Sequence, residues 1–231
     1  SSGDGVAAAL RAGAVLGDLE FIQFHQTAMK NSSILISESA RGAGGHLLNL
    51  RGERFTNELA PRDEVARAIH EEMLRGESVF LDIRHLGKEF IEHELPQEAK
   101  LAKLYEGVDP IHELIPIKPA AHYTMGGIWV DADAQTNIAG LFAAGECANQ
   151  RVHGANRLGG NSLLEVVVFG KKAGESAAHH AKEAIPFVNS SNQKAFWEAK
   201  IKEIKNYTNE INFYQAHQEL GEIFYKSVGI L

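Results

Sequence analysis

The stretch that decides the fold is H-G-A-N-R-L-G-G-N-S-L-L-E, which runs from His153 to Glu165 and leads into the apolar run Val166 to Phe169. The glycines and asparagines around its single arginine, Arg157, are poor helix formers. Ser162, followed three residues later by Glu165, forms a capping box, which predicts the start of a buried helix. The N-terminus of such a helix attracts an anionic or electron-rich ligand. The structural alternative is a tight turn before a core helix, with Arg157 in solvent.

Length and composition indicate a globular protein with a sizeable core. The chain has 231 residues, of which 44% are apolar, and a formal net charge of -7 at pH 7. Because no basic cluster accompanies this charge, we expect no nucleic-acid partner. The single cysteine, Cys147, excludes an intramolecular disulfide, and we expect it to be a small buried residue. The sequence contains no signal peptide and no apolar run of the roughly 18 residues that a spanning helix needs. It begins without a methionine and in mid-pattern, so we expect a piece of a longer protein.

Apolar periodicity and turn residues predict a mixture of helices and strands. The clearest helix runs from Pro61 to Arg75, stops at Gly76 and buries Val65, Ile69 and Met73 on one face. Strands are expected at Leu19 to Phe24, ending at His25, and at Ser33 to Ser37, Val79 to Ile83, Ile128 to Val130 and Thr136 to Glu146. Further helices are expected at Val6 to Ala14, Gly87 to Gly107, Ser162 to about Pro186, Gln193 to Tyr207 and Glu210 to Ser227.

Arginine and histidine side chains in this acidic protein stand at the ends of predicted elements and in glycine-rich loops. With one carboxylate, the candidates are His25, Glu38, Arg41, Arg62, His122, His153 and Arg157. Guanidinium groups bind carboxylates in a bidentate manner and imidazoles donate hydrogen bonds, so together they predict an anion pocket that selects a small dicarboxylate. A zinc site and a Ser-His-Asp hydrolase are excluded, because the sequence holds neither H-E-x-x-H nor G-x-S-x-G.

Three charged residues have both a structural and a functional interpretation. Arg62 stands in the first turn of its predicted helix, where a cation opposes the helix dipole at a cost of up to about 1 kcal/mol. It therefore either acts outside the helix or is an exposed arginine beside Asp63. Asp4 either caps the helix that follows it or contacts a ligand. Glu146 follows a predicted buried strand, where it is either a plain helix-start residue or a ligand contact, since open α/β sheets bind ligands at that position.

Six segments, in order along the chain, resemble those of one flavoprotein family. They are G-D-L-E-F-I-Q-F-H-Q-T, I-S-E-S-A-R-G-A-G-G, L-A-P-R-D-E-V-A-R, H-Y-T-M-G-G, L-F-A-A-G-E and H-G-A-N-R-L-G-G-N-S-L. With them the chain resembles the flavoprotein subunits of fumarate reductase and succinate dehydrogenase, a family that includes L-aspartate oxidase. The resemblance covers nearly everything from Ser1 to about Ala181 and implies an FAD enzyme. The chain departs from the family where His25-Gln26-Thr27 replaces H-P-T and where R-G-A-G replaces R-G-E-G.

The resemblance implies a fold of mixed α+β and α/β type, in which a capping domain interrupts the FAD-binding domain. Residues 1–18 and 121–185 would belong to the FAD-binding domain, residues 19–120 would form the capping domain, and residues 186–231 would begin a C-terminal helical domain. The N-terminal half of family members, with its dinucleotide-binding loop, is absent from this sequence. We therefore expect the piece alone to be inactive and to hold FAD weakly or not at all.

The resemblance also implies roles for individual residues. The substrate carboxylates would be held by His25, Ser37, His122 and Arg157. Arg62 would protonate one alkene carbon while reduced flavin gives hydride to the other, and Glu38 with Arg41 would return a proton to Arg62. The catalytic set is thus His25, Glu38, Arg41 and Arg62. Contacts with FAD would come from Asp4, His122, Tyr123, Glu146, Arg157, Leu158, Gly159, Gly160, Asn161, Ser162 and Leu163. The resemblance implies no metal ligand.

Family members differ in substrate. V-F-L-D-I-R-H-L-G and Y-E-G-V-D-P-I-H-E-L-I-P-I-K-P-A-A-H-Y-T-M-G-G are similar to fumarate reductase, whereas S-S-G-D-G and E-L-A-P-R-D-E-V-A-R-A-I are similar to aspartate oxidase. We expect interconversion of fumarate and succinate, with L-aspartate oxidase, which forms iminoaspartate, as the alternative. The first function implies an iron–sulfur subunit, a membrane anchor and a cytoplasmic location that is peripheral on the membrane face. The second implies neither partner.

Overall fold

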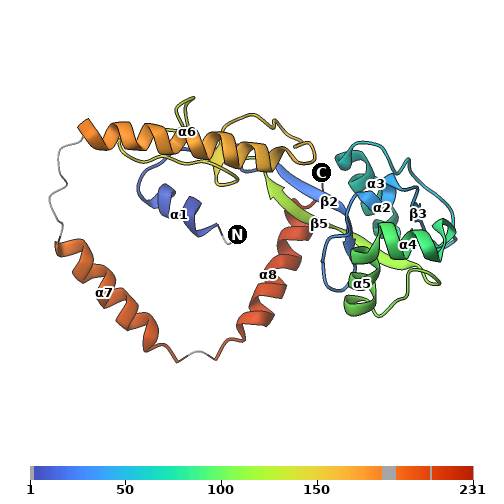
Figure 1. Cartoon of the computed structure of the whole chain (residues 1–231). Helices are drawn as coiled ribbons and strands as arrows, with labels where there is room; N and C mark the ends of the chain where they lie inside the picture. Colours follow the sequence, from blue (N-terminus) through green and yellow to red (C-terminus); the bar gives the residue numbers. More distant parts are fainter. Residues whose placement is uncertain (1–2, 184–190, 209, 231) are drawn as a thin grey trace. The chain divides into compact units, whose positions relative to one another are not determined.

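The computed structural model describes residues 3–183, 191–208 and 210–230 (Figure 1). The chain divides into two compact units, Ser1–Ala178 and His179–Leu231, and the long helix α6 (Asn161–Glu183) runs across the division. The first unit combines two sheets with helices, so the fold class is mixed α and β, as the sequence predicted. The domain boundary predicted between residues 185 and 186 lies outside the described residues.

The larger sheet is built around two long antiparallel strands, β2 (Ile22–Met29) and β5 (Ile115–Thr124), which are the long arrows in Figure 1. Its strand order is β2-β5-β4-β3, with β4 (Val79–Asp82) and β3 (His46–Leu48) completing it. Every neighbouring pair in this sheet is antiparallel. Strand β5 was not predicted, because Pro116 and Pro119 argue against a central strand. Pro119 is tolerated because it lies beyond the part of β5 that pairs with β4.

Helix α3 (Arg62–Leu74) confirms the amphipathic helix predicted from Pro61 to Arg75. It buries Val65 and Ile69, contacts β2, β4 and β5, and is followed by Gly76 with a φ of 84°. Its buried residues join an apolar core with Met29, Ile36, Leu47, Leu81, Ile83, Ile115 and Ile117. The core is completed by the short elements α2 (Ser39–Gly42), η1 (Arg84–Leu86), α4 (Lys88–Glu94) and α5 (Pro96–Tyr105).

A smaller sheet holds the segments that flank the larger one in sequence. Its order is β1-β6-β7, from Leu16–Gly17, Gly127–Trp129 and Ala148–Asn149, with β6 and β7 parallel. Helix α1 (Asp4–Arg11) contacts β6. The apolar core between this helix and the smaller sheet includes Ala9, Ala14, Ile128 and Val130. Strand β6 confirms the prediction at Ile128 to Val130, and α1 confirms the predicted first helix with a shift of a few residues.

Several local predictions were wrong. Ser33 to Ser37 contributes only an isolated bridge from Leu35, and Thr136 to Glu146 is loop apart from a bridge between Gln135 and Phe142. Strand β2 does not end at His25 but continues to Met29, since the following residues pair with β5. Cys147 is exposed rather than buried, because it lies in the turn before β7.

The capping box predicted at Ser162 is also wrong. Helix α6 begins at Asn161, before Ser162, and the Glu165 carboxylate accepts hydrogen bonds from distant side chains instead of capping the helix. The helix is not buried as predicted, since Glu165 is its only buried residue in the described part of the chain. The apolar side chains of Leu163, Leu164 and Val167 are 73%, 63% and 70% exposed.

In its described part, the second unit holds the end of α6 and the helices α7 (Ser191–Lys205) and α8 (Phe213–Val228), which lie close to the predicted ranges. The Asn212 side chain caps α8 by accepting hydrogen bonds from the N–H groups of Tyr214 and Gln215 at 3.0 and 3.3 Å. The apolar side predicted for α7 is present but exposed, with Trp197 and Ile201 at 54% and 52%.

The glycine pair after β5 permits a close approach of two backbones. A Cβ atom on Gly126 would lie 2.1 Å from the carbonyl oxygen of Asp18, so we expect Gly126→Ala to lower the free energy of unfolding by at least about 1–3 kcal/mol. Urea titration followed by circular dichroism measures the change. Gly42→Ala is the matched control, because a Cβ there meets nothing within 4 Å and Gly42 lies in α2. Equal stability of the two variants would contradict the close approach.

Candidate functional site

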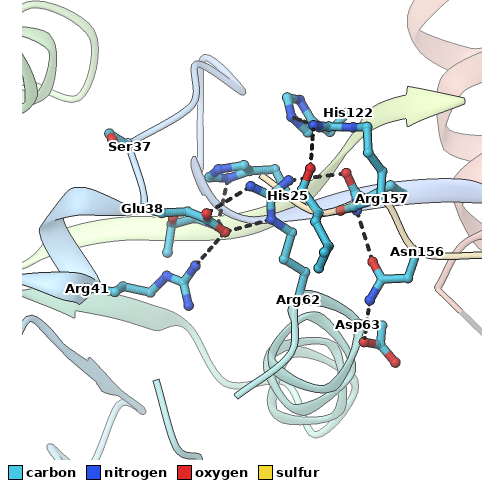
Figure 2. Close-up of polar contacts among 12 residues, drawn as sticks. His25, Ser37, Glu38, Arg41, Arg62, Asp63, His122, Asn156 and Arg157 are labelled. Atoms are coloured by element: carbon cyan, nitrogen blue, oxygen red, sulfur yellow. Dashed lines mark hydrogen bonds and ion pairs between the residues drawn. The ribbon is translucent and has the colours of Figure 1, made fainter. Parts of the chain in front are cut away.

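A cavity of about 540 Å³ lies where β2, β5, α3, α5 and the loop before α6 meet. Among its lining residues are seven that the sequence predicted for the site: His25, Ser37, Glu38, Arg62, His122, Gly159 and Gly160. The sequence analysis missed five others: Leu35, Ile36, Gln97, Glu98 and Leu101. Figure 2 shows the polar side chains of this site and the contacts that join them. Residues more than 130 positions apart in the chain therefore line one cavity.

Arg62 projects from the first turn of α3 into the site and makes a bidentate ion pair with Glu38 (Figure 2). Its Nε and Nη2 atoms donate to the two carboxylate oxygens of Glu38 at 2.7 and 2.8 Å. Its side chain is 14% exposed, so the alternative of a surface arginine beside Asp63 is wrong. Asp63 pairs with Arg67 instead, at 2.6 Å.

Glu38 connects Arg62 to a second arginine. The Nη2 atom of Arg41, from α2, donates to Glu38 at 3.2 Å, and the Arg41 side chain is 5% exposed. Hydrogen bonding to Arg62 lowers the pKa of Glu38, and burial lowers the pKa of Arg41. The Glu38 side chain is 40% exposed, so this chain of three charged groups reaches from the cavity to solvent.

His25 and His122 lie on the adjacent strands β2 and β5, not at element ends or in loops as the sequence suggested. Their rings make an edge contact with centroids 5.2 Å apart. Burial, with further contributions from His122 and Arg62, lowers the pKa of His25 to about 4. Burial and the nearby Arg157 lower the pKa of His122 as well. The His25 imidazole is therefore neutral at pH 7 and can donate or accept a hydrogen bond according to its tautomer.

Arg157 is 4% exposed, so the alternative in which it is solvated is wrong. Its guanidinium carbon lies 4.4 Å from the centroid of the Tyr123 ring, and its Nη2 lies 3.2 Å from Nε2 of His122. Burial lowers the pKa of Arg157. Among the described residues, its buried Nε atom has no hydrogen-bond partner. Arg157 does not itself line the cavity, but it contacts His122, which does. A buried, unpartnered donor next to a lining residue indicates a place for an acceptor from a ligand.

Gln23 is a site residue that the sequence analysis missed. Its Nε2 atom donates to the Arg157 carbonyl at 2.6 Å and to Oδ1 of Asn156 at 2.9 Å, while its Oε1 accepts from Arg62 at 3.2 Å. Asn156 also donates to Asp63 at 3.1 Å (Figure 2). The available signal was strand periodicity, since Gln23 and His25 are two apart and both are buried on β2.

The remaining predicted residues occupy varied positions. Ser37 lines the cavity, and its Oγ accepts a hydrogen bond from Ser39 at 2.9 Å. Glu146 lies in a turn and accepts from the N–H of Thr124 at 3.2 Å. Asp4 is exposed in the first turn of α1, where it follows Gly3 at the cap position. His153 does not line the cavity, because its ring is buried against Glu165 at 3.0 Å.

A family described as FAD binding domain matches residues 1–163 of the chain. The chain belongs to this FAD-binding family. The fumarate reductase flavoprotein subunit of Proteus vulgaris is 43% identical over 258 aligned residues, which cover 99% of the chain and 43% of that protein. L-aspartate oxidase 2 of Ralstonia nicotianae is 48% identical over 195 residues, or 80% of the chain and 36% of that protein. The chain thus spans less than half the length of these relatives.

Solved structures of this FAD-binding family share the fold. FrdA from a mutant of E. coli quinol fumarate reductase matches with a TM-score of 0.90 at 40% identity, over 98% of the chain and 44% of FrdA. Sdh1 of Mycobacterium smegmatis, in complex with UQ1, matches with a TM-score of 0.80 at 40% identity, over 98% of the chain and 41% of that protein. The resemblance to the fumarate reductase and succinate dehydrogenase flavoproteins, inferred from six motifs, is confirmed.

The residues before α6 fit FAD, the cofactor of this family. Gly160 has a φ of 81° and faces open space where a Cβ would lie, which leaves the backbone accessible to a ligand. The N-terminus of the 23-residue helix α6 carries a partial positive charge toward that space. The exposed side chains of Leu158 and Leu163 lie in the same segment. A flavin is held by hydrogen-bond donors, by close approach of the backbone and by apolar side chains, and this segment supplies all three.

None of the helices within residues 3–183, 191–208 and 210–230 has the length and apolar character to cross a membrane. In the same ranges, no group of three or more His, Cys, Asp or Glu side chains is arranged to hold a metal ion.

The buried position of His25 leads to a pH-dependent prediction. We expect its ring to titrate near pH 4 instead of 6.5, which NMR of labelled imidazole nitrogens measures, with His25→Gln used to assign the signal. Between pH 6.5 and 4 the unfolded chain binds a proton that the folded chain does not, so this histidine lowers stability as the pH falls through that window. A midpoint near 6.5 would show that the ring is solvated.

Proposed function

We propose that the chain supplies the substrate pocket, and part of the flavin-binding region, of an FAD-dependent oxidoreductase that interconverts fumarate and succinate. The observation that carries the proposal is that Arg62, paired with Glu38, shares one cavity with His25 and His122. The similarity to fumarate reductase flavoprotein subunits across 99% of the chain supports the same reaction.

In this proposal four residues hold the two carboxylates of a C4 dicarboxylate. Arg157 binds one of them, since its buried guanidinium has an unsatisfied Nε and no carboxylate within ion-pair distance in the described ranges. The other three donate hydrogen bonds to the substrate. They are His25 on β2, His122 on β5 and Ser37 in the loop before α2. Neutral imidazoles suit this task, because they donate without adding the desolvation cost of further buried charges.

Arg62 is the proposed proton donor, and Glu38 and Arg41 return protons to it. A guanidinium is a weak acid, with an ordinary pKa above about 12, and is a poor general acid unless the acceptor is strongly basic. The proton acceptor here is the alkene carbon next to the one that receives the hydride, and it is strongly basic because hydride addition gives it carbanion character beside a carboxylate. The bidentate contact with Glu38 holds Arg62 in a fixed orientation. The hydrogen bond of 2.7 Å between them is the path by which a proton passes from Glu38 to Arg62. Hydrogen bonding to Arg62 lowers the pKa of Glu38 and keeps this carboxylate ionised.

FAD, when bound, supplies the hydride for this reduction and accepts it in the reverse direction. The residues proposed to hold it are Asp4, Tyr123, Glu146 and the run from Arg157 to Leu163. Electrons would reach the flavin through partner subunits, because the similar E. coli FrdA belongs to a quinol fumarate reductase. We therefore propose an iron–sulfur partner and a membrane anchor, with the flavoprotein held peripherally on the cytoplasmic face of the membrane.

L-aspartate oxidase is the second candidate function. The observation that favours it is the 48% identity to the Ralstonia nicotianae L-aspartate oxidase 2 over 80% of the chain. An aspartate substrate has the same four-carbon diacid skeleton, so the same carboxylate contacts serve both functions. Fold and cofactor do not separate them.

Arg62→Lys tests the proposed proton donor in a flavoprotein of full family length that contains this chain. Lysine keeps the charge but cannot make the bidentate contact with Glu38, so we expect kcat for fumarate reduction to fall at least about 100-fold with flavin content unchanged. Viologen oxidation measures the rate. Arg67→Lys is the matched control on the same helix, since Arg67 is 44% exposed and pairs with Asp63 at the surface of α3. A wild-type rate in the Arg62 variant would remove this residue from the mechanism.

Two assays on the same preparation separate the candidate functions. Fumarate-dependent oxidation of reduced viologen is expected if the chain belongs to a reductase. Aspartate-dependent formation of hydrogen peroxide, without fumarate turnover driven by viologen, would instead assign the oxidase function.

A further inference from the structure

A buried cluster behind Arg157 is not part of the proposed clamp or of the proton path. It consists of Glu165 from the first turns of α6, Tyr123 from β5 and His153 from the loop between β7 and α6. Glu165 and Tyr123 are 4% and 7% exposed, and the His153 side chain is 5% exposed. A carboxylate buried to this extent is expensive unless its oxygens accept hydrogen bonds.

Both donors in the cluster converge on one oxygen of Glu165. The Tyr123 hydroxyl donates to Oε2 at 2.5 Å, and His153 Nε2 lies 3.0 Å from the same atom. The rings of Tyr123 and His153 meet edge to face, with centroids 5.8 Å apart. Burial and the Glu165 carboxylate raise the pKa of Tyr123, so the phenol stays protonated and remains a donor.

The opposite side of Tyr123 faces Arg157. The guanidinium carbon lies 4.4 Å from the ring centroid, a cation–π contact. A phenol that donates a short hydrogen bond to a carboxylate has a more electron-rich ring, which strengthens its attraction for a cation. Negative charge on Glu165 is thus transmitted to Arg157 through an aromatic ring rather than by a direct ion pair.

This indirect arrangement has a consequence for ligand binding. A carboxylate paired directly with Arg157 would occupy the guanidinium donors that a ligand needs and would compete with it. With the ring between them, the cation is stabilised from its face, and no carboxylate of the cluster occupies its donors. Nη1 donates to the Leu158 carbonyl at 3.2 Å, and Nη2 lies 3.2 Å from Nε2 of His122. The Nε of Arg157 has no partner among the described side chains and backbone, as this arrangement requires.

We propose that Glu165 is a positioning residue that acts through Tyr123 to hold Arg157 charged and correctly oriented for a substrate carboxylate. The inference rests on the proposed function, since it assigns the Arg157 donors to a dicarboxylate. The role differs from that of Glu38, which contacts Arg62 directly. Both carboxylate oxygens of Glu38 accept hydrogen bonds from Nε and Nη2 of Arg62, so these two donors are occupied.

The test compares three variants in the FAD-loaded flavoprotein of full family length. Glu165→Gln removes the charge at constant size, and Tyr123→Phe removes the hydroxyl but keeps the ring. We expect each to raise KM for fumarate, and Kd for the unreactive diacid malonate measured by calorimetry, about fivefold to tenfold. The effect on kcat per bound flavin is expected to be smaller than the effect on KM. Tyr123→Leu, which removes the ring as well, is expected to weaken binding further than either.

Action through Tyr123 also predicts that the two changes are not additive. The double variant Glu165→Gln with Tyr123→Phe is expected to bind malonate no more weakly than the worse single variant. Glu72→Gln is the matched control, since Glu72 is also 4% exposed but contacts Arg75 in α3. We expect it to leave KM, Kd and kcat unchanged.

The outcomes separate this inference from the proposed function. A wild-type flavoprotein that neither reduces fumarate nor binds malonate would overturn the proposed function itself. If the wild type is active, unchanged KM and Kd in both Glu165→Gln and Tyr123→Phe would overturn the positioning role alone. A fall in melting temperature with wild-type Kd would assign a purely structural role to the cluster. Should Glu165→Gln fail to fold, Tyr123→Phe and Tyr123→Leu decide by the same criteria.

Discussion

The pairing of β2 with β5 is the constraint on which the rest of the site depends. These strands are separated by about ninety residues of sequence, yet His25 is paired with Ala120, so His25 and His122 lie close together on neighbouring strands. The same strand pair carries Gln23, which holds the Arg157 loop, and Tyr123, which stacks on Arg157. A register change of one residue would turn each of these side chains to the other face of the sheet. The ladder of backbone hydrogen bonds therefore sets the geometry of the chemistry.

The electrostatics of the site follow from an uneven distribution of charge. The chain as a whole is acidic, but Arg41, Arg62 and Arg157 lie in or around one cavity. Glu38 pairs directly with Arg41 and Arg62. Desolvation works against these cations and lowers the pKa of both Arg41 and Arg157. A bound dianion would offset that cost, because it supplies the charge that the protein leaves out.

Sequence reasoning predicted the residue types of the site better than its architecture. Helix α3 was predicted because Pro61, Gly76 and a regular apolar face agree on it. Strand β5 was missed because it contains two prolines. Pro119 lies beyond the part of β5 that pairs with β4, whereas Pro116 lies within that part, opposite Phe80. The capping box failed because a tertiary hydrogen bond from Tyr123 draws Glu165 inward, and tertiary contacts override local preference. Arg62 was predicted because a cation in the first helical turn conflicts with the dipole, whereas its bidentate partner Glu38 had no comparable local signal. The resemblance to a family added the convergence of distant residues, which periodicity cannot supply.

The segment between β2 and β5, residues 30–114, is an insertion that extends the sheet from which it starts. It begins after Met29, which pairs with Ile117, and its own strands β4 and β3 continue the sheet beyond β5. It carries Glu38, Arg41 and Arg62, whereas His25, His122 and Arg157 belong to the surrounding polypeptide. Backbone pairing between β4 and β5 and a shared apolar core fasten this segment to the strands that receive it. A change of packing within the segment therefore reaches His25 and His122 through the sheet itself.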